Sequence, residues 1–363
     1  MPLVFLIVLA TFSLFCNAEQ WPAEQWPERL APRSPALDEL QRYSFPPRDD
    51  ASRNGVRTDG LLVIRDGQVI YERYSAPTSA STAHATWSIS KSLLATVLGV
   101  AFSEGRFALQ DAVVDYYQPF RKHPDVRLQD LLHWASGLDW QEDYEYAPLN
   151  SSVVAMLYTR GRTDMAAYAA QCGRFSAPGR QFRYSSGDSN VLAAVLKNLV
   201  GAHDYPNYPW RALFEPLGIH HAVWETDATG TFVASSYAYL TARDLARVGL
   251  LMLRDGRWRQ RQLLPPEWVA FNRTPFAHAT AEPGEATPGG HWWLNRAIGA
   301  APRPWPSAPE DTFAALGHWG QGLYILPKQK LVIVRYGDDR DGSFSHDALL
   351  ERVLAAFPEE AGQ

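Results

Sequence analysis

The chain has 363 residues, 46% of them hydrophobic, and its 34 lysines and arginines against 39 acidic residues give it a formal net charge of −5. This length and composition predict a globular protein of roughly two structural units and exclude an intrinsically disordered chain. The negative charge, without a cluster of basic residues, argues against nucleic acid as a partner.

The first 18 residues have the pattern of a secretory signal peptide. An apolar run covers residues 3–15, and Cys16-Asn17-Ala18 places small residues before the expected cut. The run is too short to cross a bilayer, and no later segment has the roughly 20 apolar residues of a membrane helix. We therefore expect a secreted or periplasmic protein without a stable transmembrane anchor; lipid attachment at Cys16 is the less favoured alternative. Cleavage after Ala18 would leave Cys172 as the sole cysteine, which excludes an intramolecular disulfide.

Residues 19–54 are interpreted as a Pro-rich leader. They begin with a tandem repeat, in which Glu19-Gln20-Trp21-Pro22-Ala23 is followed by Glu24-Gln25-Trp26-Pro27-Glu28. Five residues are too few for a folding repeat. Docking of the two tryptophans on the protein body is one interpretation, and a duplication without function is the one we favour.

From residue 55 onward the pattern predicts a strand hairpin, a buried helix and then a helical unit. Two β-rich runs at 61–64 and 69–74 flank Asp66-Gly67, which is a strong hairpin signal. An apolar helix containing Ser88 follows. Residues 106–224 are expected to form an inserted, mostly helical domain, whose clearest helices are at 128–134, 153–158 and 191–200.

The C-terminal part returns to strands. A helix is predicted at 242–253, a second hairpin from the runs at 323–326 and 331–336, and a closing amphipathic helix at 348–357. The stretch 271–311 is irregular and rich in proline and tryptophan, and we expect it to be functional. Strands near both ends of the chain predict an α/β domain made of residues 55–105 and 225–357, with one antiparallel sheet flanked by helices.

Ser88 and Lys91 form the first candidate catalytic pair. Residues at positions i and i+3 of a helix are neighbours, so the Ser88 hydroxyl and the Lys91 amine are expected to meet. An amine kept uncharged by burial can accept the serine proton and so make the hydroxyl a nucleophile. The chain has only five lysines, and this one lies in an apolar helix. The alternative is a solvated lysine beside a helix-capping serine.

Two later segments supply candidate partners for this pair. Tyr184 follows a Pro-Gly turn and precedes a helix, and a phenol near an amine can relay a proton to a leaving group. His318 lies in Gly317-His318-Trp319-Gly320-Gln321-Gly322, whose glycines allow backbone N–H groups to approach a ligand. Taken singly, each is also consistent with a structural role, and the argument rests on the set.

The order of these motifs resembles that of a known family. Ser-x-x-Lys, then Tyr-x-Ser about a hundred residues later, then His-x-Gly near the C-terminus is the order found in class C β-lactamases, DD-peptidases, family VIII esterases and 6-aminohexanoate-dimer hydrolases. The segments 128–138 (LQDLLHWASGL) and 240–246 (LTARDLA) are similar to two further segments of that family. The resemblance covers about residues 59–357 and implies a β-lactamase/transpeptidase-like fold.

The resemblance also implies roles for individual residues. Ser88 would be the acylated nucleophile, Lys91 its base and Tyr184 the proton relay, and the N–H groups of Ser88 and Gln321 would form the oxyanion hole. Ser186 stands where β-lactamases carry an asparagine, and His318 and Trp319 stand in place of the lysine and threonine of their Lys-Thr-Gly triad. The further residues expected to bind substrate are Gly320 and the pair Trp292 and Trp293, which would line an apolar acyl pocket.

These observations predict an exported serine hydrolase that needs no metal or organic cofactor. The loss of an amide at Ser186 and of a fixed cation at His318 favours esters, amides or peptides over β-lactams as substrates. A different class remains as the alternative, a non-catalytic homologue that binds peptidoglycan or peptide fragments in the same cleft. The bulk of Trp319 motivates that alternative.

Overall fold

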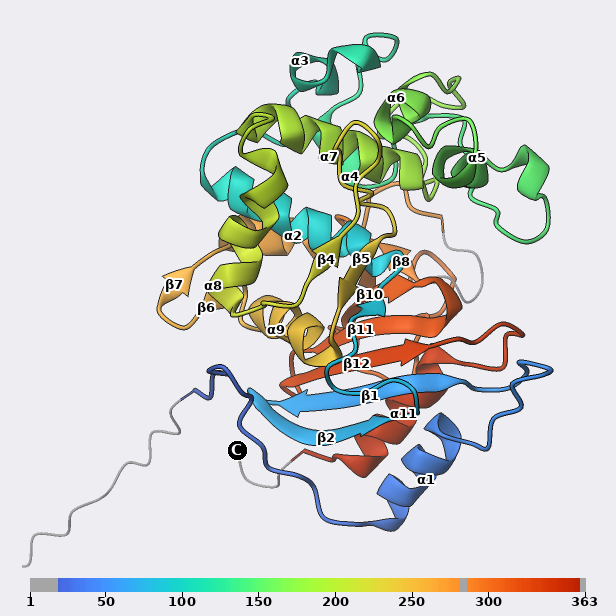
Figure 1. Ribbon diagram of the computed structural model, residues 1–363, viewed down its shortest axis with the longest axis vertical. Coiled ribbons are helices and arrows are strands. Elements are labelled where there is room, and N and C mark those ends of the chain that lie inside the picture. The colour runs from blue at the N-terminus through green and yellow to red at the C-terminus, as the bar shows by residue number, and fades with distance from the viewer. Residues whose placement is uncertain (1–18, 281–285, 360–363) are drawn as a thin grey trace, which may run out of the picture.

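A computed structural model describes residues 19–280 and 286–359 of the chain (Figure 1). The predicted signal peptide, with Cys16 and the cut after Ala18, lies outside the described residues. A large sheet occupies the lower half of Figure 1, and a helical part stands above it, with helix α2 between the two. No helix in the described ranges has the length and apolar character needed to cross a membrane.

The main sheet joins the two ends of the chain, as the sequence predicted. Within the described residues it has seven antiparallel strands in the order β2-β1-β12-β11-β10-β9-β8, and β1 pairs with β12 so that Val63 lies opposite Ile333. Its strands are β1 (Thr58–Arg65), β2 (Gln68–Tyr74), β8 (Thr287–Pro288), β9 (Trp293–Leu294), β10 (Phe313–Gly317), β11 (Gln321–Leu326) and β12 (Leu331–Gly337). Both predicted hairpins are present. Asp66 and Gly67 have φ angles of 47° and 85°, as a two-residue hairpin turn with right-handed strand twist requires.

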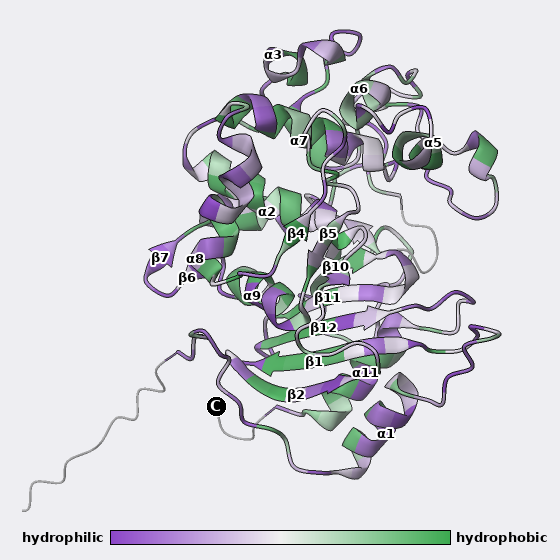
Figure 2. Ribbon diagram, in the orientation of Figure 1, coloured by the Kyte–Doolittle hydropathy of each residue, from purple (hydrophilic) through white to green (hydrophobic). Residues whose placement is uncertain are grey.

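Helices cover both faces of this sheet. Because side chains alternate along a strand, Leu61 and Val63 face α1 (Pro35–Ser44) and α11 (His346–Ala356), whereas Leu62 and Ile64 join the core that contains α2 (Ile89–Ser103) and α9 (Ala242–Leu253). Helix α2 is buried along nearly its whole length, and Figure 2 shows it and β1 in the hydrophobic colour. This burial places the start of α2, with Ser88, between the sheet and the helical part.

The helical part is the expected insertion, with short helices around a long central one. Helix α7 (Ser186–Val200) packs on α2 and begins two residues after Tyr184. The other helices of the described residues are α3 (Val113–Tyr116), α4 (Leu128–Leu132), α5 (Ser152–Tyr158), α6 (Met165–Ala170), α8 (Glu215–Leu217) and α10 (Pro266–Asn272). Two small sheets complete the strands: β3 (His84–Ala85) with β5 (Ala238–Leu240) and β4 (Val223–Trp224), and β6 (Arg257–Trp258) with β7 (Arg261–Gln262).

The leader contains a helix that the sequence analysis missed. Helix α1 begins after Ser34, whose side chain accepts a hydrogen bond from the Leu37 N–H, and Pro35 occupies the first helical turn. Leu37 and Leu40 lie on one face of it and pack on the sheet beside α11. The sequence analysis did not predict this helix, because only two of its apolar residues, Leu37 and Leu40, are buried and they are too few to make a periodic pattern visible.

The tandem repeat is docked on the protein body, so our preferred interpretation of a duplication without function was wrong. Trp26 is 4% exposed, and its indole N–H donates to the Arg243 carbonyl oxygen at 3.1 Å. Trp21 lies edge-on to Trp258 at 5.3 Å. Arginine guanidinium groups of α9 and β6 stack on the two indole rings: Arg247 on Trp26, and Arg254 and Arg257 on Trp21.

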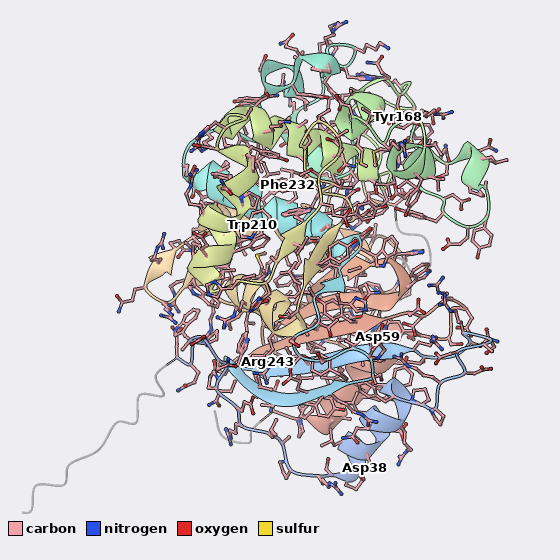
Figure 3. All side chains as sticks on the ribbon, viewed as in Figure 1. Asp38, Asp59, Tyr168, Trp210, Phe232 and Arg243 are labelled. Atoms are coloured by element: carbon pink, nitrogen blue, oxygen red, sulfur yellow. The ribbon has the colours of Figure 1, made fainter. Side chains whose placement is uncertain are left out.

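The docked repeat ties the leader to both the helices and the sheet. Arg243, which is labelled in Figure 3, reaches from α9 to Glu72 of β2 and to Glu28, which directly follows the second Trp-Pro. Ala23 and Glu24 also form part of the wall of a cavity of about 740 Å³, together with residues of α8 and the β6–β7 hairpin. None of the residues lining that cavity belongs to the sequence-predicted site.

Candidate active site

Ser88 stands at the N-terminus of α2 with its hydroxyl free of any capping bond. The residue before it, Trp87, has a φ of 49°, which marks a sharp turn into the helix. Lys91 lies one turn further along, and its Nζ donates a hydrogen bond to Ser88 Oγ at 2.9 Å. The expected contact between the hydroxyl and the amine is confirmed.

The Lys91 amine is held in a dry environment. Its side chain is 1% exposed, and its second hydrogen bond goes to the carbonyl oxygen of Ser235 at 2.8 Å. Burial lowers the pKa of Lys91 from 10.5 to about 8, and the negative charge of Glu142 opposes part of that shift. An appreciable fraction of the amine is therefore uncharged near neutral pH.

Tyr184 completes the set of three groups. Lys91 Nζ lies 4.9 Å from the centroid of the Tyr184 ring, and Ser88 is near enough to the phenol to lower its pKa slightly. Burial is the main cause that raises the pKa of Tyr184 well above its usual value of 10, with the charge of Glu142 acting in the same direction. The phenol therefore keeps its proton, as a donor to a leaving group must.

Two buried rings hold Tyr184 in place. Trp134 lies edge-on to it at 4.9 Å and stacks on His291 at 4.6 Å. His291 is itself fixed from both ring nitrogens, by the Leu132 carbonyl oxygen at 2.7 Å and the Ser189 hydroxyl at 2.9 Å. Burial lowers the pKa of His291 to about 3, so this histidine is neutral.

The turn between β10 and β11 forms the opposite wall. His318, Trp319 and Gly320 make up η5 (His318–Gly320), and the rings of His318 and Trp319 lie edge-on to Trp87 at 5.4 and 5.2 Å. His318 Nε2 lies 2.9 Å from Glu145 Oε1. Burial lowers the pKa of His318, while Glu145 opposes that shift.

Gly317, the last residue of β10, brings this turn close to Ser88. A Cβ atom added to Gly317 would lie 2.4 Å from the carbonyl oxygen of Thr86, so the two backbones pass in direct contact. Gln321 lies beyond the turn in β11, fully buried, and its side-chain amide donates to the carbonyl oxygens of His318 and Gly337. Among the described residues, no hydrogen bond joins Gln321 to Ser88, and its predicted oxyanion role stays a prediction.

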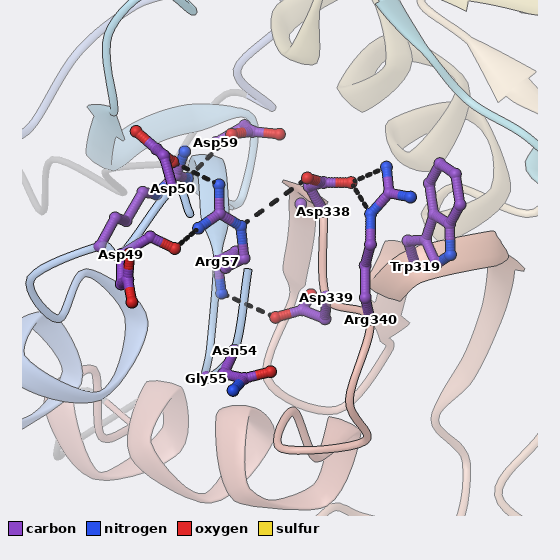
Figure 4. Close-up of polar contacts among 12 residues, drawn as sticks. Asp49, Asp50, Asn54, Gly55, Arg57, Asp59, Trp319, Asp338, Asp339 and Arg340 are labelled. Atoms are coloured by element: carbon purple, nitrogen blue, oxygen red, sulfur yellow. Dashed lines mark hydrogen bonds and ion pairs between the residues drawn. The ribbon is translucent and has the colours of Figure 1, made fainter. Parts of the chain in front are cut away.

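An arginine–aspartate pair packs against Trp319 (Figure 4). The Arg340 guanidinium stacks on the Trp319 ring at 3.6 Å and donates to Asp338 Oδ1 at 2.9 Å. Behind the turn, the fully buried Arg335 donates to the Gly320 carbonyl oxygen at 2.7 Å and to Asp339 Oδ2 at 2.6 Å. The turn that carries His318 is thus held by charged groups on two sides.

Two predicted substrate-binding residues face away from the cleft. Ser186 has no exposed surface, and both its N–H and its hydroxyl donate to the Glu142 carboxylate. Trp292 is also fully buried and packs edge-on to Phe313 at 5.5 Å. The predicted substrate contacts of Ser186 and Trp292 stay predictions. Trp293 is only partly buried and stacks on Trp134 at 5.1 Å, so it remains a candidate for the pocket wall.

Comparisons with known proteins show the family to which this chain belongs. A family model described as Beta-lactamase matches residues 42–356. The chain belongs to the Beta-lactamase family. This Beta-lactamase family protein is 26% identical over 310 residues to the 6-aminohexanoate-dimer hydrolase of Paenarthrobacter ureafaciens. The matched residues cover 80% of this chain and 74% of that relative.

Solved structures of other proteins share the fold of this Beta-lactamase family protein. A Bacillus anthracis protein assigned as a 6-aminohexanoate-dimer hydrolase matches with a TM-score of 0.70 at 21% identity, covering 93% of this chain and 88% of that one. EstCE1, described as a hydrolase with promiscuous acyltransferase activity, matches with a TM-score of 0.68 at 18% identity, covering 89% and 98%. The predicted β-lactamase/transpeptidase-like fold is confirmed, and the named relatives are hydrolases.

Three acidic and aromatic residues beside the site of this Beta-lactamase family protein were not predicted from the sequence. Glu142, Tyr144 and Glu145 come from the loop between α4 and α5, and Tyr144 stacks on His318 at 5.2 Å. The only sequence signal for them is the run Glu142-Asp143-Tyr144-Glu145-Tyr146, in which acidic and aromatic residues alternate shortly after the 128–138 segment. Such a run in a loop has no periodicity that would separate it from an ordinary solvated turn.

Proposed function

We propose that this protein is an exported serine hydrolase that cleaves a carboxylic ester or amide through an acyl-enzyme on Ser88. The observation that carries this proposal is the 2.9 Å hydrogen bond from the Lys91 amine to Ser88 Oγ, made where burial brings the pKa of that amine down to about 8. The hydrolase names of the relatives support the reaction class. The signal-peptide pattern of residues 1–18 supports export.

The first half of the reaction forms the acyl-enzyme. Uncharged Lys91 takes the proton of the Ser88 hydroxyl as Oγ attacks the substrate carbonyl carbon, so the C–O bond forms and the carbonyl oxygen becomes an oxyanion. When the tetrahedral adduct collapses, the Tyr184 phenol gives its proton to the departing oxygen or nitrogen and regains one from the Lys91 ammonium. In the second half, water attacks the acyl carbon and gives a proton to Lys91, the bond to Ser88 Oγ breaks, Oγ takes that proton from the Lys91 ammonium, and the carboxylic acid leaves.

The oxyanion needs donors at the point where Ser88 meets the β10 turn. We infer that the Ser88 N–H supplies one donor and that the His318 N–H, the first peptide after Gly317, supplies the other. The close passage of Gly317 over Thr86 brings this turn to Ser88, and Gln321, which pairs with Gly317 at the start of β11, stays the alternative donor. Both donors belong to backbone held by regular structure, which keeps them oriented before the reaction begins.

Esters and linear amides are the proposed substrates. Ser186 offers its hydroxyl to Glu142 and not to the cleft, and His318, paired with Glu145, replaces the fixed cation that β-lactamases use. The name of the related 6-aminohexanoate-dimer hydrolase supports this choice, whereas two solved structures of similar fold are described as β-lactamases. We expect slow opening of nitrocefin by comparison with ester turnover.

A fluorophosphonate probe tests the proposal directly, because it forms a covalent bond only with an activated serine. Wild-type protein is expected to be labelled at Ser88, and Ser88→Ala is expected to remain unlabelled. Equal labelling of the two proteins would overturn the proposal. Absence of labelling together with tight binding of peptidoglycan fragments would favour a non-catalytic binding protein.

A further inference from the structure

The cavity beside the docked leader shares no lining residue with the Ser88 site and has the size of a ligand-binding pocket. Its volume is about 740 Å³, within the range of about 300 to 1,000 Å³ that is usual for small-molecule sites. The Ala23–Glu24 turn of the leader, helix α8 and the β6–β7 hairpin form its wall, together with Arg247 of α9. Figure 1 shows α8 next to that hairpin. Segments that are far apart in the sequence therefore enclose this space.

Two arginines bring their guanidinium groups to the same turn of the leader. Arg247, which is 3% exposed, donates to the carbonyl oxygens of Ala23 at 2.8 Å and Glu24 at 3.0 Å. Arg259 donates to the carbonyl oxygen of Pro22 at 2.9 Å. Because these three acceptors belong to consecutive residues, the two positive charges lie close together at the wall of the cavity.

The arginines that line the cavity have no carboxylate partner. Arg261 is the third of them, and none of the three forms an ion pair within the part of the chain that the structure describes. The third acceptor of Arg247 is also a backbone oxygen, the Leu217 carbonyl at 2.9 Å. Burial lowers the pKa of Arg247, Asp244 opposes that shift from beyond ion-pair distance, and the positive charge of Arg259 adds to it.

The neighbouring arginines outside the cavity are paired with acidic residues of the leader. Arg243 forms an ion pair with Glu28, and Arg254 and Arg257 both form one with Glu19. The repeat thus neutralises the arginines around the cavity and leaves those in its wall without a counter-ion. Carbonyl oxygens offset part of the cost of a buried cation but do not neutralise its charge, which favours binding of an anion from solution.

Two carboxylates, those of Glu24 and Glu215, also belong to the lining. Both residues are exposed, and among the described residues no ion pair joins either of them to the three arginines. His220, the remaining ionisable residue of the lining, is exposed as well. With that histidine neutral, three arginines and two glutamates give the lining a net charge of +1, in a chain whose net charge is −5.

We propose that this cavity binds a small molecule in which an oxyanion, a carboxylate or a phosphate, is joined to an apolar group. Guanidinium groups are planar and bind both kinds of oxyanion through paired hydrogen bonds. Leu217 and Trp258, which are 1% and 4% exposed, supply the apolar part of the wall. Because the cavity is separate from the Ser88 site, this inference does not depend on the proposed function.

Calorimetric titration with benzoate and with phenyl phosphate tests the proposal, because each joins a ring to one of the two oxyanions. Benzamide is the control ligand, since it has the shape of benzoate without the charge. The wild-type protein is expected to bind at least one of the two anions about tenfold or more tightly than benzamide. Tighter binding of phenyl phosphate would identify the ligand as a phosphate, and tighter binding of benzoate would identify it as a carboxylate.

The double substitution Arg259→Gln and Arg261→Gln locates the bound anion, and it is expected to weaken binding about tenfold or more. Both arginines are exposed, so the variant is expected to fold, which its thermal unfolding midpoint checks. Arg121→Gln with Arg162→Gln is the matched control, because it removes the same number of charges from exposed positions outside the cavity. Binding of neither anion by the wild-type protein would overturn the proposal, and so would equal loss of affinity in the two double variants or no loss in either.

Discussion

Gly317 and Thr86 are in backbone contact, so that a single methyl group on Gly317 would meet the Thr86 carbonyl oxygen at 2.4 Å. The same methyl group would lie 2.9 Å from the Cβ of Gln321, so neighbouring atoms crowd it on two sides. This contact sets the distance between the two backbone segments that we assign to the oxyanion hole. Glycine is therefore needed at 317 because a side chain would not fit there. Its backbone conformation does not require glycine, because any residue can adopt a φ of −134°.

Gly317→Ala is expected to lower the rate of fluorophosphonate labelling by about tenfold or more and the free energy of unfolding by about 1 to 3 kcal/mol, since the extra methyl group forces the segments apart. Labelling kinetics and urea unfolding measure the two effects. Gly173→Ala is the control, because no atom lies within 4 Å of the added methyl group there. Normal labelling of Gly317→Ala would show that this contact does not set the site.

The pH dependence of acylation follows from the Lys91 amine. Its pKa of about 8 means that the base is protonated below that pH and free above it. The rate of Ser88 labelling is expected to rise about tenfold per pH unit below pH 8 and to level off above it. A stopped-flow or quenched labelling series from pH 5 to pH 10 measures this profile. A rate that is flat from pH 5 to pH 8 would show that Lys91 is not the base.

Tyr184→Phe removes only the phenol oxygen and so tests the proton relay. We expect kcat/KM for p-nitrophenyl esters to fall by about 100-fold, and that for linear amides to fall further, because an amine departs only when it is protonated whereas nitrophenolate departs unaided. Steady-state assays of both substrate types measure the difference, with Tyr43→Phe as a control far from the site. An equal loss for esters and amides would argue against proton delivery to the leaving group.

Lys91 is expected to reduce the stability of the fold while it enables catalysis. The unfolded chain holds the lysine proton up to a pKa near 10.5, whereas the folded chain releases it near 8, so the unfolded state binds more protons between these values. The folding penalty is complete below pH 8 and fades as the pH rises from 8 to 10.5. Lys91→Met is therefore expected to raise the free energy of unfolding at pH 7 by about 1 to 3 kcal/mol and to abolish labelling.

Urea unfolding at pH 7 and at pH 10 tests this prediction, because the stability gained by Lys91→Met should be smaller at pH 10. The exposed Lys122 provides the control, and Lys122→Met is expected to change stability little at either pH. A loss of stability in Lys91→Met at pH 7 would show that the hydrogen bonds of the amine outweigh its desolvation.

The parts of the site that the sequence predicted correctly are those set by local spacing. Ser88 and Lys91 meet because three residues make about one helical turn, and the hairpin at Asp66-Gly67 forms because both residues accept a positive φ. Tyr184 was found through its turn and the helix that follows it. These signals lie within a few residues of the groups that they place, so they can be recognised in the sequence before the fold is known.

The residues that the sequence did not reveal depend on contacts between distant segments. Glu142 is held by Ser186, which is 44 residues away, and His291 is fixed beside the site by Leu132 and Ser189. Trp292 and Trp293 are adjacent in sequence yet face the core and the site respectively, because side chains of extended chain alternate. A segment with only two residues in a strand offers no pattern from which that parity can be predicted.

The tandem repeat predicts unequal contributions from its two tryptophans. Trp26 is 4% exposed and belongs to the main core, whereas Trp21 is partly exposed and packs at its edge. Trp26→Ala is expected to lower the free energy of unfolding by about 3 to 5 kcal/mol and Trp21→Ala by less, since the cost follows the area and the cavity left behind. Urea unfolding measures both, with Leu30→Ala as the control because Leu30 is 63% exposed in the same segment. Fluorophosphonate labelling of the folded variants should stay at the wild-type rate, because neither tryptophan touches the Ser88 site. Equal and small losses for both tryptophans would mean that the repeat lies on the surface without holding the fold together.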